Sequence, residues 1–208
     1  MKFKKKIKTK WHQQRSKDQF FLKAKKLGYR SRSAFKLLEI NKKFRILKKG
    51  QNALDLGAAP GGWSQILSEK IFSKEKKNII ISVDLKELKP IQNLVLIKKN
   101  IFDEDFILFI KKYFSNGVDI VVSDAAPSTS GNKFVDHIKI IELAERSLVI
   151  AKKILKKSGV LVIKIFDGKE TKKITDKIKN KFLNFNLYKP KSSKTESKEI
   201  YIVARFLK

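Results

Sequence analysis

The sequence predicts an α/β fold with a mostly parallel, doubly wound sheet and an antiparallel C-terminal strand. From residue 52 onward, short apolar segments alternate with longer amphipathic ones, the order that builds parallel sheets with helices on both faces. Residues 79–81 and 160–163 are apolar at every position, as expected for strands covered on both faces. A glycine-rich turn follows the first predicted strand, which is typical of folds that hold a nucleotide-type cofactor.

The expected elements follow in chain order. A helix is expected from Ser33, a favourable N-cap, with Phe35, Leu38, Ile46 and Leu47 on its apolar side. The predicted strands are 52–57, 78–84, 94–99, 118–124 and 159–166, and the predicted helices are 61–72, 103–114, 134–157 and 169–183. A last pair of strands, 186–190 and 199–207, has no helix between its members, so we expect an antiparallel hairpin at one edge of the sheet.

The composition is strongly basic. The 208 residues include 49 Lys or Arg against 20 acids, for a net charge of +29. Of the basic residues, 43 are Lys and 6 are Arg, a bias typical of an A/T-rich coding genome. Exchanging Arg for Lys leaves the charge unchanged, however, so this bias does not explain the excess over the acids. A field of this sign and size favours a polyanion, and we expect nucleic acid as the partner.

Several classes of protein are disfavoured by what the sequence lacks. It has no Cys, and its two His residues, His12 and His137, lie far apart, so neither a disulfide nor a metal site is expected. No apolar run approaches the ~18 residues of a membrane span, and no secretory signal is evident. We therefore expect a cytoplasmic protein, active as a monomer, with one domain over residues 33–208.

Residues 1–32 form a basic N-terminal arm. They contain thirteen Lys or Arg and a single acid, Asp18, with Trp11, Phe20, Phe21 and Tyr29 interleaved. Basic side chains attract phosphates and aromatic rings stack on unpaired bases, so we expect the arm to contact RNA. The alternative is a solvated tail whose aromatic residues dock on the domain.

The glycine turn restricts the choice of cofactor. Gly57 and Gly61 are separated by three residues and Trp63 follows two positions later, which is neither the dinucleotide fingerprint nor a phosphate loop. Such a turn fits the amino-acid half of S-adenosylmethionine better than a pyrophosphate, and it disfavours a nicotinamide-dependent oxidoreductase. Asp84, at the end of the next predicted strand, can accept hydrogen bonds from a ribose. The alternative is a glycine turn that binds nothing.

Three charged residues are expected near this turn, because ligands in open α/β sheets collect at the carboxyl ends of the parallel strands. Asp124 ends the fourth predicted strand, Lys164 ends the fifth, and Glu199 begins the final antiparallel strand at the same edge. A Lys between apolar strand residues needs a partner or a task. The alternatives are a snorkelling Lys164, a helix-capping Asp124 and an ordinary exposed Glu199.

Five segments together resemble the FtsJ/RrmJ family. They are residues 29–39 (YRSRSAFKLLE), 55–65 (DLGAAPGGWSQ), 123–127 (SDAAP), the strand around Lys164, and 189–201 (KPKSSKTESKEIY). The resemblance implies a Rossmann-like S-adenosylmethionine-dependent methyltransferase fold and ribose 2′-O-methylation. The implied substrate is a uridine in the A-loop of 23S ribosomal RNA within the large ribosomal subunit.

The resemblance also implies roles for individual residues. The family's Lys-Asp-Lys-Glu tetrad falls on Lys36, Asp124, Lys164 and Glu199, although Lys36 alone has the local sequence of a solvated helix face. Beside Gly57, the residues implied around S-adenosylmethionine are Gly61, Trp63, Asp84 and Asp124. Asn100 stands where the family often has an acid that meets the adenine amino group, and an Asn can still accept that hydrogen bond.

In the implied reaction a ribose 2′-oxygen attacks the methyl group of a sulfonium in an in-line displacement. Lys164 is the candidate base, because burial and the second cation at Lys36 disfavour its charged form, an effect that Asp124 opposes. Asp124 is expected to orient Lys164 and the donor, and Glu199 to hold Lys36 and the ribose. The alternatives are a methyltransferase for transfer RNA or a messenger cap, and a catalytically idle RNA-binding factor of ribosome assembly.

Overall fold

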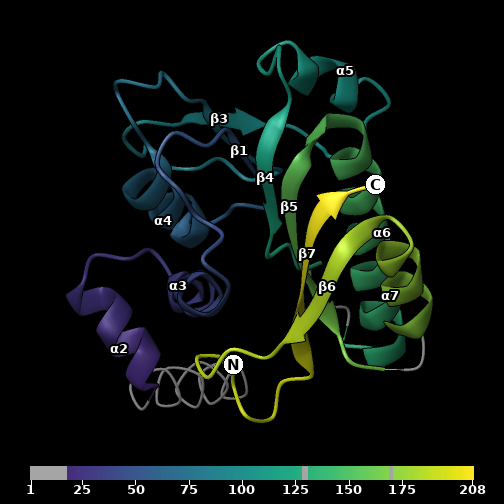
Figure 1. Cartoon of the computed structure of the whole chain (residues 1–208). Helices are drawn as coiled ribbons and strands as arrows, with labels where there is room; N and C mark the ends of the chain where they lie inside the picture. Colours follow the sequence, from purple (N-terminus) through teal and green to yellow (C-terminus); the bar gives the residue numbers. More distant parts are fainter. Residues whose placement is uncertain (1–17, 128–130, 169–170) are drawn as a thin grey trace.

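A seven-stranded sheet with helices on both faces forms the centre of the molecule (Figure 1). The computed structural model describes residues 18–127, 131–168 and 171–208. The strand order is β3-β2-β1-β4-β5-β7-β6. The strands are β1 (Ala53–Leu56), β2 (Ile80–Asp84), β3 (Val95–Lys98), β4 (Val118–Ser123), β5 (Leu155–Phe166), β6 (Phe182–Tyr188) and β7 (Glu199–Leu207). Strands β1 to β5 pair in parallel, whereas β7 lies antiparallel between β5 and β6.

Helices lie on both faces of the sheet (Figure 1). The helices are α2 (Gln19–Lys26), α3 (Ser33–Phe44), α4 (Gly62–Ile71), α5 (Phe106–Lys111), α6 (Lys133–Ile154) and α7 (Thr171–Lys179). Figure 1 shows α3 and α4 on one side of the sheet and α6 and α7 on the other. The α/β class, the mostly parallel sheet and the antiparallel C-terminal strand are thus confirmed. None of the helices in the described ranges combines the length and apolar character needed to cross a membrane.

Two apolar layers result from strand alternation. Val160 and Val162 of β5 point to the α3/α4 face, where they pack in one cluster with Leu37 and Ile66. Leu161 and its alternate neighbours on β5 point to the opposite face and join a second cluster with α6 and α7. Residues that continue the first alternation toward the carboxyl end of β5 therefore emerge beside α3.

Some predicted boundaries are wrong. Ser33 is the first residue of α3 rather than its N-cap, and the helix ends at Phe44 because Arg45 adopts a left-handed conformation with φ of 51°. Ile46 and Leu47 consequently lie beyond the helix. The helix α5 is shorter than the predicted 103–114, since residues 103–105 form turns.

The last helix and strand also differ from the prediction. We expected a helix over 169–183 and a strand over 186–190, but α7 ends at Lys179 and β6 spans Phe182–Tyr188. Phe182 is buried in the core and pairs with Leu207 of β7, so this residue belongs to the sheet rather than to the helix. The predicted antiparallel pairing is present, with β6 at the edge and β7 inside the sheet.

Candidate active site

Lys164 lies at the carboxyl end of β5 and points to the α3/α4 face, two residues after Val162 in the strand alternation. Ser123 of β4 pairs with Ile163, so Asp124 directly follows beside Lys164. The Lys164 Nζ donates to the main-chain oxygen of Asp124 at 2.6 Å and lies 3.2 Å from its Oδ1. The register of two neighbouring strands therefore produces this ion pair.

The first residues of β7 contribute two more side chains to the same place. Tyr201 pairs with Lys164 across the strands, and Glu199, two residues earlier, pairs with Phe166. The Tyr201 hydroxyl donates to Asp124 Oδ1 at 2.7 Å. Because side chains two apart on a strand share a face, Glu199 also points toward α3.

Helix α3 supplies the fourth charge. The Lys36 Nζ lies 2.8 Å from Glu199 Oε1 and 2.9 Å from Oε2. Ala34, Leu37 and Ile40 bury the core-facing side of α3 and thereby fix the orientation in which the helix presents Lys36 to β7.

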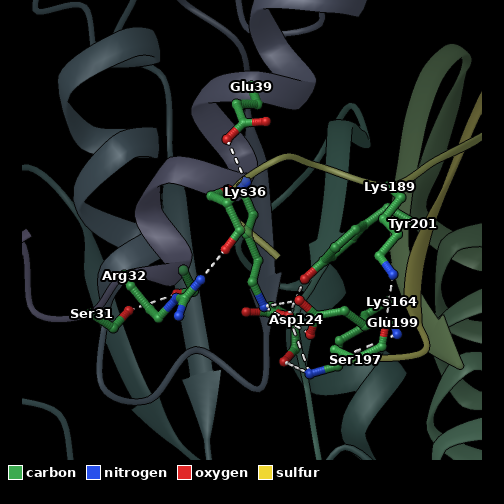
Figure 2. Close-up of polar contacts among 12 residues, drawn as sticks. Ser31, Arg32, Lys36, Glu39, Asp124, Lys164, Lys189, Ser197, Glu199 and Tyr201 are labelled. Atoms are coloured by element: carbon green, nitrogen blue, oxygen red, sulfur yellow. Dashed lines mark hydrogen bonds and ion pairs between the residues drawn. The ribbon is translucent and has the colours of Figure 1, made fainter. Parts of the chain in front are cut away.

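The structure brings the four predicted residues of the tetrad together, although they are spread over 163 positions (Figure 2). Lys36 is only 9% exposed and Lys164 only 7% exposed. Burying two ammonium groups is costly even when each has a carboxylate partner, so such a cluster is weak evidence for added stability. Perturbed charged groups of this kind cluster at functional sites. The burial of Lys164 contradicts the alternative of a snorkelling side chain, and the burial of Lys36 contradicts the alternative of a solvated helix face.

The cluster shifts the acidity of its members in opposite directions. Burial acts to raise the pKa of Asp124, but the charges of Lys164 and Lys36 and the hydrogen bond from Tyr201 outweigh it, so the pKa lies below its ordinary value. The pKa of Tyr201 is raised well above its ordinary value by burial and by the negative charges of Asp124 and Glu199. At neutral pH the site thus contains an ionised Asp124 that accepts a hydrogen bond from the neutral phenol of Tyr201.

A pocket of about 490 Å³ opens beside this cluster. Its lining includes Gly57, Asp84, Asn100 and Asp124 together with the apolar side chains of Leu85, Ile101 and Leu143. This volume and mixture of apolar walls with a few polar groups are typical of sites for small molecules and cofactors. Asp124 belongs to both the pocket and the charge cluster, so the two form one site.

Gly57 is required by the shape of the turn. Its φ is +71°, and a Cβ at this position would lie 2.4 Å from the Cβ of Ala125. Its N–H donates to Val83 of β2, which holds the turn against the sheet. The chain can therefore pass close under the pocket only with glycine here.

Two polar residues of the pocket are oriented by the backbone around them. Asp84 accepts hydrogen bonds at 2.8 Å from the N–H groups of Ala59 and Lys86, so it ties the glycine turn to the end of β2. The Asn100 Oδ1 accepts from the N–H of Phe102 at 3.0 Å. These bonds fix the direction in which each side chain faces the pocket.

Gly61 and Trp63 lie outside the pocket lining. Gly61, with φ of 108°, precedes the first residue of α4. Trp63 is buried, its Nε1 donates to the main-chain oxygen of Ser33 at 2.9 Å, and its ring lies 5.7 Å from the ring of Tyr201. In the structure Trp63 thus connects α4 with α3 and β7, beneath the charge cluster.

Sequence reasoning missed two residues of this site. Tyr201 was part of a motif but had no role, although its spacing of two from Glu199 places it on the same face. Asp55 in β1 is 1% exposed; its Oδ2 accepts from Ser64 Oγ at 2.7 Å, and its Oδ1 has no hydrogen-bond partner among the described residues. An acid inside an apolar strand was the available signal for Asp55.

Burial raises the pKa of Asp55 to about 7. The hydrogen bond from Ser64 acts in the opposite direction, and the negative charges of Asp124 and Asp84 add to the rise. Asp55 therefore carries less charge near neutral pH than an ordinary aspartate, directly below the glycine turn.

The described part of the basic arm packs against α3. Asp18 caps α2 through hydrogen bonds to the N–H groups of Phe20 and Phe21, and it forms an ion pair with Arg32. The rings of Phe20 and Tyr29 lie 5.6 and 5.8 Å from the ring of Phe35. Trp11 and His12 lie outside the described residues.

Known proteins resemble this chain in sequence along most of their length. The chain is 42% identical to the ribosomal RNA large subunit methyltransferase E of Rickettsia canadensis, over 93% of this chain and 86% of that protein. It is 38% identical to the protein of the same name from Methanothermobacter thermautotrophicus, over 95% of this chain and 93% of the relative.

A solved structure and a family model agree with these relatives. The crystal structure of a ribosomal RNA methyltransferase from Plasmodium falciparum superposes with a TM-score of 0.76 at 32% identity, covering 86% of this chain and 98% of that one. The model of the FtsJ-like methyltransferases matches residues 29–206, which include all four residues of the charge cluster. The chain therefore belongs to the FtsJ-like methyltransferase family.

Proposed function

We propose that this protein transfers a methyl group from S-adenosylmethionine to the ribose 2′-hydroxyl of a uridine in the A-loop of 23S ribosomal RNA. The observation that carries the proposal is the buried cluster of Lys36, Asp124, Lys164 and Glu199 at the wall of the glycine-turn pocket. The ribosomal substrate is supported by relatives named as large subunit ribosomal RNA methyltransferases.

The pocket suits the proposed donor in chemistry as well as in size. Its apolar walls at Leu85, Ile101 and Leu143 fit an adenine ring, and Asp84 and Asn100 offer polar groups to the nucleoside. Asp124 lines the wall next to the cluster, where its carboxylate is paired with Lys164. When bound there, S-adenosylmethionine would supply the methyl group of its sulfonium to a nucleophile, with the thioether as the leaving group.

The protein's share of the reaction is to position the ribose and to accept its proton. The 2′-hydroxyl would lose its proton as its oxygen forms the new bond to the methyl carbon, while the carbon–sulfur bond of the donor breaks and the neutral thioether leaves. Lys164 would accept the proton at Nζ. Asp124 holds Nζ in place through its carboxylate and its main-chain oxygen. Tyr201 in turn fixes the Asp124 carboxylate.

Lys36 and Glu199 are assigned to the substrate side of the cluster. Their ion pair leaves the Lys36 ammonium near the point where negative charge develops on the ribose oxygen, so it can stabilise that charge. Glu199 keeps the Lys36 side chain from turning away into solvent. Together the four residues would hold a flexible nucleotide in the geometry for in-line attack.

Charge supports RNA as the partner, and the arm is assigned to it. The excess of basic residues in the chain favours a polyanion, and thirteen of them lie in residues 1–32. We assign the reaction to a cytoplasmic monomer whose arm contacts RNA beside the site. The large ribosomal subunit, rather than free RNA, is the proposed substrate.

The direct test is to incubate the protein with methyl-labelled S-adenosylmethionine and large subunits from cells that lack this modification, and to map the label by mass spectrometry. The proposal expects the label on the ribose of one uridine in the A-loop. A label on a base nitrogen, or in transfer RNA added as competitor but not in the subunit, would contradict it.

A further inference from the structure

The segment 189–198, which connects β6 to β7, is fastened to α3 by a carboxylate. Glu39 Oε2 accepts the N–H of Lys191 at 2.6 Å, and Glu39 Oε1 accepts the N–H of Ser192 at 2.9 Å. Both carboxylate oxygens thus bind consecutive main-chain amides of a segment more than 150 positions away in the chain. Charge-assisted hydrogen bonds of this kind are about twice as strong as neutral ones.

Two side chains of α3 and that of its N-cap residue, Arg32, contact this segment or the residue that follows it (Figure 2). Arg32, Lys36 and Glu39 are spaced by four and three residues, so they lie along the same face. Arg32 donates to the main-chain oxygen of Ser192, while Lys36 binds Glu199. Ser192 is therefore held through both its N–H and its oxygen.

Glu199 lies where this segment joins the end of the sheet. Glu199 is the first residue of β7, and its partner Phe166 is the last residue of β5, so neither strand continues beyond this pair. Hydrogen bonds at a strand end open most readily. One further main-chain hydrogen bond, from the N–H of Asp167 to Lys198, lies beyond this pair, and the Ser197 hydroxyl accepts the Glu199 N–H. The residues that precede Glu199 therefore help to place the carboxylate that pairs with Lys36.

We propose that Glu39 is a positioning residue for the methyl-transfer site, because it fixes segment 189–198 on α3 and so places Glu199 opposite Lys36. The inference rests on the proposed function, since Glu199 matters only if the Lys36 pair serves catalysis. Glu39 itself lies outside the lining of the pocket and acts through the segment.

The test compares Glu39→Ala, Glu39→Gln and a control, Glu75→Gln, an exposed acid in the turn between α4 and β2. In Glu39→Ala both hydrogen bonds are lost, and we expect kcat for ribose methylation to fall about tenfold. Glu39→Gln keeps an amide oxygen as acceptor and should recover part of the loss. The Kd for S-adenosylmethionine should stay within about twofold in every variant, because Glu39 does not line the pocket.

A double-mutant cycle separates positioning from general stability. If Glu39 acts through Glu199, Glu39→Ala should reduce kcat by no more than about twofold when it is added to Glu199→Gln. A full tenfold loss in that background would overturn the inference, and so would wild-type kcat in the single variant. If Glu39→Ala does not fold, Glu39→Gln takes its place in the same cycle.

Amide hydrogen exchange tests the same contact without any activity. The amides of Lys191 and Ser192 should exchange faster in Glu39→Ala than in the wild type, whereas Glu75→Gln should leave them unchanged. Unchanged exchange in segment 189–198 would overturn the inference. Should the wild-type enzyme fail to methylate ribose, the proposed function fails, and exchange still decides whether Glu39 holds the segment.

Discussion

At the scale of single residues, the site depends on the Asp124 carboxylate, which several groups bind at once. Asp124 accepts from Tyr201 and pairs with Lys164, so it is ionised and held in one orientation. The aromatic ring of Tyr201 packs on Trp63, whereas its hydroxyl binds Asp124. The two contacts use different parts of the side chain and can be tested separately.

Tyr201→Phe should therefore lower kcat without unfolding the protein. The variant keeps the ring contact with Trp63 but removes the hydrogen bond to Asp124, which raises the pKa of that carboxylate and loosens its hold on Lys164. We expect about a 3- to 10-fold lower kcat, as for the loss of roughly 1 kcal/mol. Turnover equal to that of a Tyr188→Phe control would argue against a role for the hydroxyl.

Asp55 makes stability depend on pH in the direction opposite to most aspartates. Its pKa of about 7 in the folded protein exceeds the ordinary value of 3.8, so between about pH 4 and 7 the folded state holds a proton that the unfolded chain has lost. The free energy of unfolding contributed by Asp55 is thus highest at low pH and falls as pH rises through this window.

The variant Asp55→Asn removes this ionisation and should become more stable relative to wild type as pH rises. The difference between the two proteins in free energy of unfolding should change by roughly 2–4 kcal/mol from pH 4 to pH 8. Urea unfolding of both proteins at these two values measures it, and the other ionisable groups cancel in the comparison. A difference independent of pH would show that Asp55 titrates normally.

At the scale of elements, the junction of β1 and α4 brings the backbone under the pocket. The turn at Gly57 lies against Ala125, which follows β4, and the carboxylate of Asp84, the last residue of β2, accepts a hydrogen bond from the N–H of Ala59 in the same turn. Three strand ends thus hold one turn, and its geometry leaves no room for a side chain.

Gly57→Ala should damage both stability and donor binding. The left-handed φ costs about 1–2 kcal/mol for any residue with a Cβ, and the contact of 2.4 Å with Ala125 forces the strand ends apart. We expect a loss of about 1–3 kcal/mol in stability and about tenfold weaker binding of S-adenosylmethionine by calorimetry.

Gly28→Ala is the matched control for this change. Gly28 has a similar φ of +75°, but a Cβ there would meet nothing within 4 Å. It should lose stability of the same order from the backbone alone and keep normal donor affinity. Equal donor affinity in the Gly57 and Gly28 variants would mean that the turn does not shape the pocket.

Strand interiors were more predictable than the ends of elements. Residues 79–81 and 160–163 are apolar at every position because both faces of the sheet are covered, and this pattern is visible in the sequence. The end of α7 and the start of β6 were not predictable from local pattern, because the burial of Phe182 against α6 and α7 decides them. Tertiary packing overrides local preference at such boundaries.

The same distinction applies to the site. Lys164 and Asp124 were predictable because each stands out at the end of an apolar strand. Lys36 was not, because its helix has the local sequence of a solvated surface, and only the family resemblance singled it out. Its burial arises from β7, which reaches α3 from more than 150 positions away and which local sequence does not reveal.

At the scale of the whole molecule, the dominant feature is the strong positive charge, which is +29 for the chain. The two lysines of the site contribute little to this excess, because each is paired with a carboxylate, so most of the excess basic residues lie outside the site. The excess charge is therefore available to attract phosphates over a wide surface, while the site selects the atom that reacts.

Binding of the large-subunit RNA should accordingly depend steeply on salt. If six or more phosphates are neutralised, affinity should fall about 10³-fold or more between 50 and 200 mM salt, as measured by filter binding. Donor binding, which does not use this surface, should change by less than about threefold in the same range. A shallow dependence for RNA would mean that few of the basic residues contact phosphate.

The central claim is that Lys164 accepts the ribose proton, and single-turnover methylation by Lys164→Arg tests it most directly. Arginine keeps the positive charge beside Asp124 but does not lose its proton in water, so it cannot act as a base. With donor and subunit both saturating, we expect methylation to fall by about 10²-fold or more while donor affinity is retained. Near-normal turnover would contradict the role of Lys164 as proton acceptor.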